Sequence, residues 1–147
     1  MKEKAFEFDR RNVSRTYLLL DFEAFENDEN IIAAYYTLSI KTLNFSHGVS
    51  KRMIKDIDGF SKEAESVSAV LIGQLGKDVV NGKDLRGADI LSSAIGMAYE
   101  VSSIAGSRIV FLECEPIDKL LAFYDTNGFV RLQDNRKTGL VQMVRFL

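Results

Sequence analysis

The segment 108–128 constrains the fold of this chain more than any other part of the sequence. It begins with the apolar run RIVFLEC at 108–114, which has the length of a buried strand. Pro116 follows this run, and Gly128 lies a short helix length further on. Proline is tolerated in the first turn of a helix, and glycine readily adopts the left-handed backbone just beyond a helix end. The pattern therefore predicts a strand over 108–114, a helix over 116–127 and a sharp turn into another strand.

The remaining elements follow from hydrophobic spacing and from the position of turn residues. In chain order we expect a helix over 2–11, a strand over 14–25 with its hairpin partner over 31–43, a helix over 51–64, a strand over 67–75, a loop over 76–86, a helix over 87–103, and a closing hairpin of 129–132 with 140–146. This order predicts one α/β (α+β) domain spanning 1–147, with a mixed central sheet of about six strands flanked by helices.

The helix expected over 51–64 carries one apolar stripe. Ser50 is its candidate N-cap, and Met53, Ile57 and Phe60 fall on the same helical face. We expect this stripe to close the hydrophobic core; the alternative is that it covers a ligand cleft.

Composition excludes several classes of function. Nineteen basic and 21 acidic residues leave the chain near neutral, which argues against a broad basic surface for nucleic acid. Cys114 lies inside an apolar run and is expected to be a buried core thiol in a reducing compartment, and His47 is expected to be exposed. Neither pattern supports a metal site or a Ser-His triad. Because no apolar run approaches membrane-spanning length and no signal-peptide core is seen, we expect a cytoplasmic protein with no membrane partner.

A phosphate site is suggested where the strand over 67–75 leads through a loop into the helix over 87–103. The N-terminus of a helix that joins two parallel strands presents free N–H groups and the positive end of the helix dipole. The loop is neither G-x-G-x-x-G nor a Walker loop, which disfavours dinucleotides and nucleoside triphosphates. Many such units bind nothing, so the signal is weak by itself. Three basic residues and three glycines surround the expected site: Lys77, Lys83, Arg86, Gly76, Gly82 and Gly87.

Taken together, these segments resemble the GNAT superfamily of acyl-CoA-dependent N-acyltransferases. The resemblance covers 67–133 and extends back to Ser14, and its most specific part is FYDTNGF at 123–129. The family's loop motif, (Gln/Arg)-x-x-Gly-x-(Gly/Ala), falls on Gly82, Leu85 and Gly87, of which only the last agrees. Family members open with a strand and a helix ahead of this point, so the domain is expected to lack them.

The resemblance implies acetyl-CoA as co-substrate and no metal. In such folds two parallel strands splay apart, and the pantetheine arm pairs with the main chain of the first strand, here 74–77. The pyrophosphate lies on amides of the following loop and helix, here 83–88, where Lys83 and Arg86 would add positive charge. The implied cofactor-binding residues are Gln74, Leu75, Gly76, Lys77, Gly82, Lys83, Arg86, Gly87 and Ala88.

Tyr124 matches the tyrosine that acts as the general acid of this family. A thiol has a pKa of about 8.5 and a tyrosine about 10, so a phenol can hydrogen-bond to a departing thiolate and donate its proton at modest cost. The alternative is an aromatic residue that only packs at the helix end, under Phe129.

The general base is less specified by the sequence. A carboxylate, often acting through water, can take the proton of the attacking amine, and Glu113 is our candidate. Glu115, Asp21 and Glu23 are its rivals, and many carboxylates of this kind are only solvated or ion-paired.

The sequence thus predicts an acetyl-CoA-dependent N-acetyltransferase whose acceptor is a primary amine on a small molecule or a protein. A charged tRNA is a less favoured acceptor because the chain is near neutral. The alternatives are a non-catalytic acyl-CoA-sensing or interaction domain, and a different ligand-binding domain without CoA. A missing edge strand leaves room for a homodimer in which a partner supplies that edge.

Overall fold

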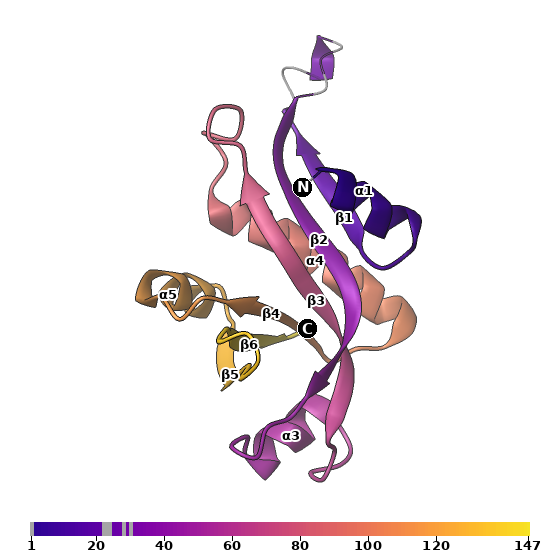
Figure 1. Ribbon diagram of the computed structural model, residues 1–147, viewed down its shortest axis with the longest axis vertical. Coiled ribbons are helices and arrows are strands. Elements are labelled where there is room, and N and C mark those ends of the chain that lie inside the picture. The colour runs from indigo at the N-terminus through magenta and orange to yellow at the C-terminus, as the bar shows by residue number, and fades with distance from the viewer. Residues whose placement is uncertain (1, 22–24, 28, 30) are drawn as a thin grey trace. The chain divides into compact units, whose positions relative to one another are not determined.

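The computed structural model describes residues 2–21, 25–27, 29 and 31–147 (Figure 1). Its helices and strands are α1 (Lys2–Arg10), β1 (Arg15–Leu20), β2 (Ile32–Asn44), α3 (Lys51–Asp58), β3 (Ser66–Lys77), α4 (Gly87–Ala105), β4 (Ile109–Cys114), α5 (Asp118–Thr126), β5 (Val130–Asp134) and β6 (Val141–Phe146). Within these residues the six strands form one sheet in the order β1-β2-β3-β4-β6-β5, which confirms the predicted fold class. No helix among them has the length and apolar character needed to cross a membrane.

The residues group into two compact units, one containing the chain up to Ser39 together with 72–97, and the other containing 40–71 and 98–147. In the first unit, β1 pairs with β2 in antiparallel register, as the sequence predicts for a hairpin. The rings of Tyr17 and Tyr36 stack with their centroids 5.1 Å apart. The Tyr36 hydroxyl also donates to the Ser93 carbonyl of α4 at 3.5 Å, so β2 and this helix are held together.

The second unit is built around a core contributed by four strands and one helix. Its buried members are Leu43, Ile57, Ala69, Ile109, Phe111 and Val144. The predicted N-cap of α3 is confirmed, since the Ser50 side chain accepts a hydrogen bond from the Met53 N–H. The prediction that the apolar stripe packs into the core is confirmed at Ile57, which is buried. It is wrong at Phe60, whose side chain is 91% exposed. Gly59 ends the helix with a left-handed backbone (φ 87°), and Phe60 therefore leaves the helical face.

The start of α5 differs from the sequence expectation, and its end agrees with it. Pro116 lies ahead of the helix, because Ile117 has an extended backbone and serves as the N-cap. The Ile117 carbonyl accepts from the N–H groups of Leu120 and Leu121 at 2.9 and 3.0 Å, which begins the helix there. Beyond the C-terminal end, Gly128 has the predicted left-handed backbone (φ 84°).

Candidate functional site

The loop between β3 and α4, in the first unit, is closed by a tight main-chain turn. β3 continues through Lys77, so the strand is longer than predicted and the loop starts at Asp78. The Asp78 N–H donates to the Ala33 carbonyl at 2.9 Å, and the Gly82 N–H donates to the Asp78 carbonyl at 3.0 Å. The Asp78 carboxylate accepts from the N–H groups of Asn81 and Val80, and these hydrogen bonds lower its pKa. The loop is thus held by a main-chain bond to β2, by one internal main-chain bond and by the Asp78 carboxylate.

Gly82 is buried inside this turn and packs directly against main-chain atoms. A Cβ at this position would lie 2.4 Å from the Ala33 carbonyl oxygen and 2.7 Å from that of Asp78. Gly76 is similarly confined, because a Cβ there would approach the Tyr35 ring to 2.9 Å. Both glycines therefore allow close packing at the end of β3 and in the loop, and this packing role requires no ligand.

Arg86 immediately precedes α4 and is held by a side chain from the first turn of that helix. Its guanidinium donates to both carboxylate oxygens of Asp89, at 2.9 and 2.8 Å. The hydrogen bond to Arg86 lowers the pKa of Asp89, and the same bond raises that of Arg86. The positive charge that the sequence assigns to a phosphate is thus shared with a carboxylate at the helix start.

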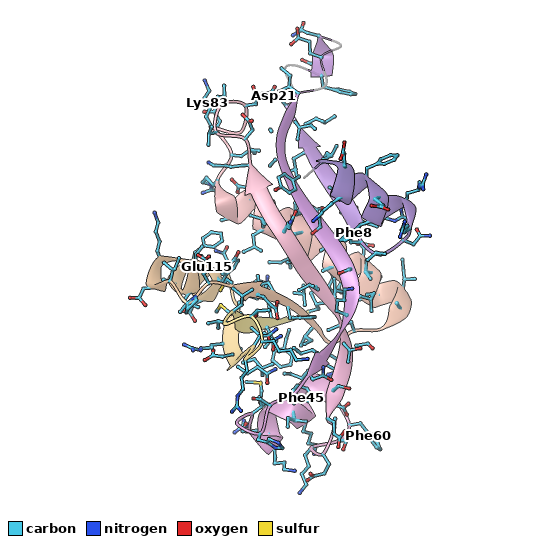
Figure 2. All side chains as sticks on the ribbon, in the orientation of Figure 1. Phe8, Asp21, Phe45, Phe60, Lys83 and Glu115 are labelled. Carbon is cyan, nitrogen blue, oxygen red and sulfur yellow. The ribbon has the colours of Figure 1, made fainter. Side chains whose placement is uncertain are left out.

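The other predicted contacts in this loop remain open to a ligand to different degrees. The N–H groups of Gly87 and Ala88 have no acceptor in the described part of the chain. Lys77 donates to the Leu85 carbonyl at 2.9 Å, whereas Lys83 is exposed at the loop (Figure 2). On β3 the Gln74 N–H is already bonded to the Thr37 hydroxyl at 2.9 Å. Two N–H groups at the start of α4 and the exposed Lys83 side chain are therefore available to a ligand.

Tyr124, in the second unit, is partly buried near the end of α5. Its ring meets those of Phe123 and Phe129 edge to face, with centroids 5.1 and 5.9 Å away. Burial, followed by the charge of the Cys114 thiolate, raises the pKa of the Tyr124 hydroxyl. This hydroxyl makes no hydrogen bond in the described residues, and it is not among their buried, unpartnered side-chain oxygens. The phenol is therefore anchored by its ring while its oxygen stays accessible.

Glu113 lies at one end of a row of polar side chains that crosses three neighbouring strands in the order β4, β6, β5. It pairs with Gln142 of β6, which in turn pairs with Gln133 of β5. The Glu113 Oε1 atom accepts from the amides of Gln142 at 2.7 Å and Asn135 at 2.9 Å. Because neighbouring residues of a strand alternate in direction, Glu113 projects from the face of β4 opposite to Cys114.

The sequence expectation missed the three amides, whose contacts form a continuous hydrogen-bonded relay. The Ser46 N–H donates to Gln133 Oε1 at 2.7 Å. Gln133 Nε2 donates to the Asn44 carbonyl and to Gln142 Oε1, each at 2.6 Å. A register shift between Arg131 and Gln133 places Gln133 opposite Gln142, and no motif signals such a shift. We name the set Gln133, Asn135 and Gln142 the amide relay.

The rival bases are placed differently. Glu115 is exposed just beyond β4, and Asp21 follows β1, where its N–H donates to the Ile31 carbonyl at 2.9 Å (Figure 2). Glu23 lies outside the described residues. Cys114 is buried and His47 is exposed, as predicted, and no group of three or more metal-binding side chains is found in the described ranges.

Comparison with known proteins finds similarity in structure rather than in sequence. No family model matches the chain, and no curated protein matches it. The solved structure of AtaT complexed with acetyl-methionyl-tRNAfMet is similar at TM-score 0.72 and 22% identity, covering 95% of this chain and 76% of that one. A mutant of KacT gives TM-score 0.69 at 25% identity, covering 96% and 76%. AtaTR bound with AcCoA gives 0.67 at 20%, also covering 96% and 76%.

These similar structures have the GNAT fold, and they match nearly the whole chain. The resemblance inferred from the sequence is therefore confirmed at the level of the fold. In this structure Gly87 begins α4 and Tyr124 lies within α5.

Proposed function

We propose that this chain is an N-acetyltransferase that moves the acetyl group of acetyl-CoA to a primary amine, with Tyr124 as the general acid. The observation that carries the proposal is the Tyr124 hydroxyl, which is accessible, has no hydrogen-bond partner in the described residues, and lies in a fold shared with a structure bound with AcCoA. Because no protein group within the described residues occupies this hydroxyl, it can hydrogen-bond to a departing thiolate.

The reaction proceeds by direct attack. The amine nitrogen bonds to the thioester carbonyl carbon, the carbon–sulfur bond breaks, and the electron pair leaves on sulfur. Burial raises the pKa of the phenol, so Tyr124 keeps its proton near neutral pH and can hydrogen-bond to the thiolate. Transfer of that proton is uphill, because a thiol has a pKa of only about 8.5, and it completes the release of CoA.

Glu113 is our candidate for the base that removes a proton from the acceptor's ammonium, directly or through a water molecule, so that the neutral amine can attack. Its Oε1 atom is held by two amides, whereas Oε2 has no partner within the described residues. One carboxylate oxygen is therefore positioned and the other remains available to accept a proton.

We propose that acetyl-CoA binds through the main chain of 74–77 and the start of α4. The N–H groups of Gly87 and Ala88 are the groups best suited to a pyrophosphate, since the helix dipole favours anions there. Lys83 would add charge from the loop, and Asp89 would oppose it by holding Arg86. Gln74, Leu75, Gly76 and Lys77 would meet the pantetheine arm, and Gly82 would keep the loop in shape.

The acceptor is a primary amine of a small molecule, of a protein, or of an aminoacyl-tRNA. The last is supported by the similar AtaT structure, which is a complex with acetyl-methionyl-tRNAfMet. A screen of amines should include all three classes, because the fold alone does not choose between them.

Substitution of Tyr124 by phenylalanine tests the proposal. We expect acetyl transfer to fall by about 10²–10⁴-fold while acetyl-CoA binding measured by calorimetry is retained, since general-acid catalysis contributes about that much. Tyr99→Phe is the matched control, because Tyr99 is an exposed tyrosine on α4 and should leave turnover unchanged. Equal turnover in Tyr124→Phe and the wild type would remove Tyr124 from the mechanism.

A second candidate is a non-catalytic domain that either senses acyl-CoA or serves in protein interactions. The Arg86–Asp89 pair favours the interaction form, because it withdraws the loop's arginine from a phosphate. Calorimetry separates these possibilities: binding of acetyl-CoA without turnover on any amine supports the sensor, and absence of binding supports the interaction domain and refutes the acetyltransferase.

A further inference from the structure

A cleft of about 500 Å³ in the second unit lies directly over Glu113 and the amide relay. This volume falls within the range of roughly 300–1,000 Å³ that is usual for small-molecule sites. Its walls come from the end of β2, from β4, and from the turn between β5 and β6. Phe45, Leu71 and Phe111 supply apolar surface, and the relay supplies polar surface.

The relay fixes the hydrogen-bonding direction of every amide beneath the cleft. Gln133 receives the Ser46 N–H on its oxygen, so its nitrogen must donate onward to Gln142. Gln142 therefore turns its own nitrogen toward Glu113. Asn135 accepts the Lys137 N–H on its oxygen and donates its amide hydrogen to the same carboxylate oxygen. The amide donors of Gln142 and Asn135 thus converge on Glu113 Oε1, and Oε2 is left as an acceptor without a partner in the described residues.

Charge in the cleft is uneven in a way that selects a ligand. Lys41, Arg136 and Lys137 line it with exposed side chains that form no ion pair in the described part of the chain. Asp134, also in the lining, is already paired with Arg131 at 2.8 Å. Three cations that form no ion pair within the described residues therefore line the same cleft as the Glu113 carboxylate. A ligand satisfies this arrangement if it brings an N–H donor to Glu113 and an anion to the basic residues.

We infer that this cleft binds a primary amine that also carries an oxyanion, a carboxylate or a phosphate, with the amino group on Glu113 Oε2 and the oxyanion on Lys41, Arg136 and Lys137. The inference rests on the proposed function in one respect, namely that Glu113 meets the amine. Recognition of the oxyanion is additional, and it makes the acceptor zwitterionic rather than simply cationic.

The test compares four small probes on the wild-type chain in the absence of acetyl-CoA. Phosphoethanolamine carries an amine and a phosphate, γ-aminobutyrate an amine and a carboxylate, butylamine only an amine, and butyrate only a carboxylate. The readout is the ¹H–¹⁵N resonances of the side-chain amides of Gln133, Asn135 and Gln142 during titration. We expect both zwitterions to shift these resonances and to bind about tenfold or more tightly than either single-charge probe, because each charged hydrogen bond is worth about that factor.

The affinities of phosphoethanolamine and γ-aminobutyrate are then compared. Tighter binding of the first indicates a phosphate ligand, and tighter binding of the second indicates a carboxylate ligand. Substitutions then locate the contacts. Glu113→Gln should weaken both zwitterions, and Lys137→Met should weaken them by removing a cation at the cleft. Lys55→Met is the matched control, because Lys55 is an exposed lysine of α3 outside the cleft lining.

Butylamine binding as tightly as the zwitterions would overturn the inference, and so would shifts that spare the three amides or the absence of binding by any probe. These outcomes are independent of acetyl-CoA. The proposed acetyltransferase fails instead if Tyr124→Phe keeps full turnover, so the two failures are distinguishable.

Discussion

Replacement of Gly82 by alanine should destabilise the first unit, because the added methyl group has no free space. Its Cβ would lie 2.4 Å from the Ala33 carbonyl oxygen and 2.7 Å from that of Asp78. Both distances are well below ordinary contact, and both atoms belong to the main chain, which cannot rotate away. The φ of Gly82 is not positive, so the cost is steric rather than conformational.

The magnitude follows from what must move. Overpacking of this kind costs typically about 1–3 kcal/mol. The two carbonyl oxygens that are pushed also accept hydrogen bonds, from the Asp78 N–H at 2.9 Å and the Gly82 N–H at 3.0 Å, and weakening them adds about 1 kcal/mol. We therefore expect a loss of about 2–4 kcal/mol, which corresponds to a fall in Tm of roughly 5–15 °C.

Gly96 provides a matched control on the same unit. It lies inside α4, and a Cβ added there would meet no heavy atom within 4 Å, so Gly96→Ala places the same group in open space. Helix propensity should then raise the stability by about 0.5–1 kcal/mol. Thermal unfolding followed by circular dichroism measures both variants. The reasoning is refuted if Gly82→Ala unfolds at the wild-type temperature, or if the two variants lose stability equally.

Three further predictions concern the second unit. Ile57→Ala should lower the free energy of unfolding by about 2–4 kcal/mol, because Ile57 is only 2% exposed. Phe60→Ala should change it by less than about 0.5 kcal/mol, because Phe60 is exposed. Urea unfolding measures both variants, and equal losses would contradict the assigned burial. Burial raises the pKa of the Cys114 thiol, and the charge of Arg131 opposes this rise. Ellman's reagent at pH 8 should therefore react slowly with the folded chain and quickly with the chain unfolded in urea. A fast reaction in the folded state would contradict this prediction. Burial, and then the Cys114 thiolate, raises the pKa of Tyr124, so the folded chain keeps that proton at a pH where the unfolded chain loses it. Stability should therefore fall as the pH rises above about 10, and less steeply in Tyr124→Phe; parallel pH profiles would refute the assignment.

The sequence predicts most of the fold because its signals are local. Hairpin partners, the Ser50 cap and the left-handed Gly128 each depend on residues close together in the chain, and the structure confirms them. Phe60 shows where such reasoning ends. A helical stripe continues in the sequence after the helix has stopped, and Gly59 decides the stopping point. Pro116 likewise suggests a helix that begins at 116. Because Ile117 has an extended backbone, α5 begins at Asp118 instead.

The candidate site is less readable from the sequence because its contacts join distant residues. Tyr124 could be proposed as the general acid from its local context, and that role stays a proposal. The Arg86–Asp89 pair, although only three residues apart, competes with the phosphate role that charge alone suggests for Arg86. The amide relay could not be foreseen, since it requires the register shift that brings Gln133 opposite Gln142.

The amide relay also has an evolutionary consequence. Its outer end is fixed by main-chain atoms of Asn44 and Ser46, so no single amide can reverse its orientation without leaving a neighbour unpaired. Substitution of Gln133 should therefore leave Gln142 with an unpaired amide oxygen. A further substitution of Gln142 should then lower the stability by little more. Substitutions in the relay are expected to show strong epistasis, and related chains should keep or discard its members together.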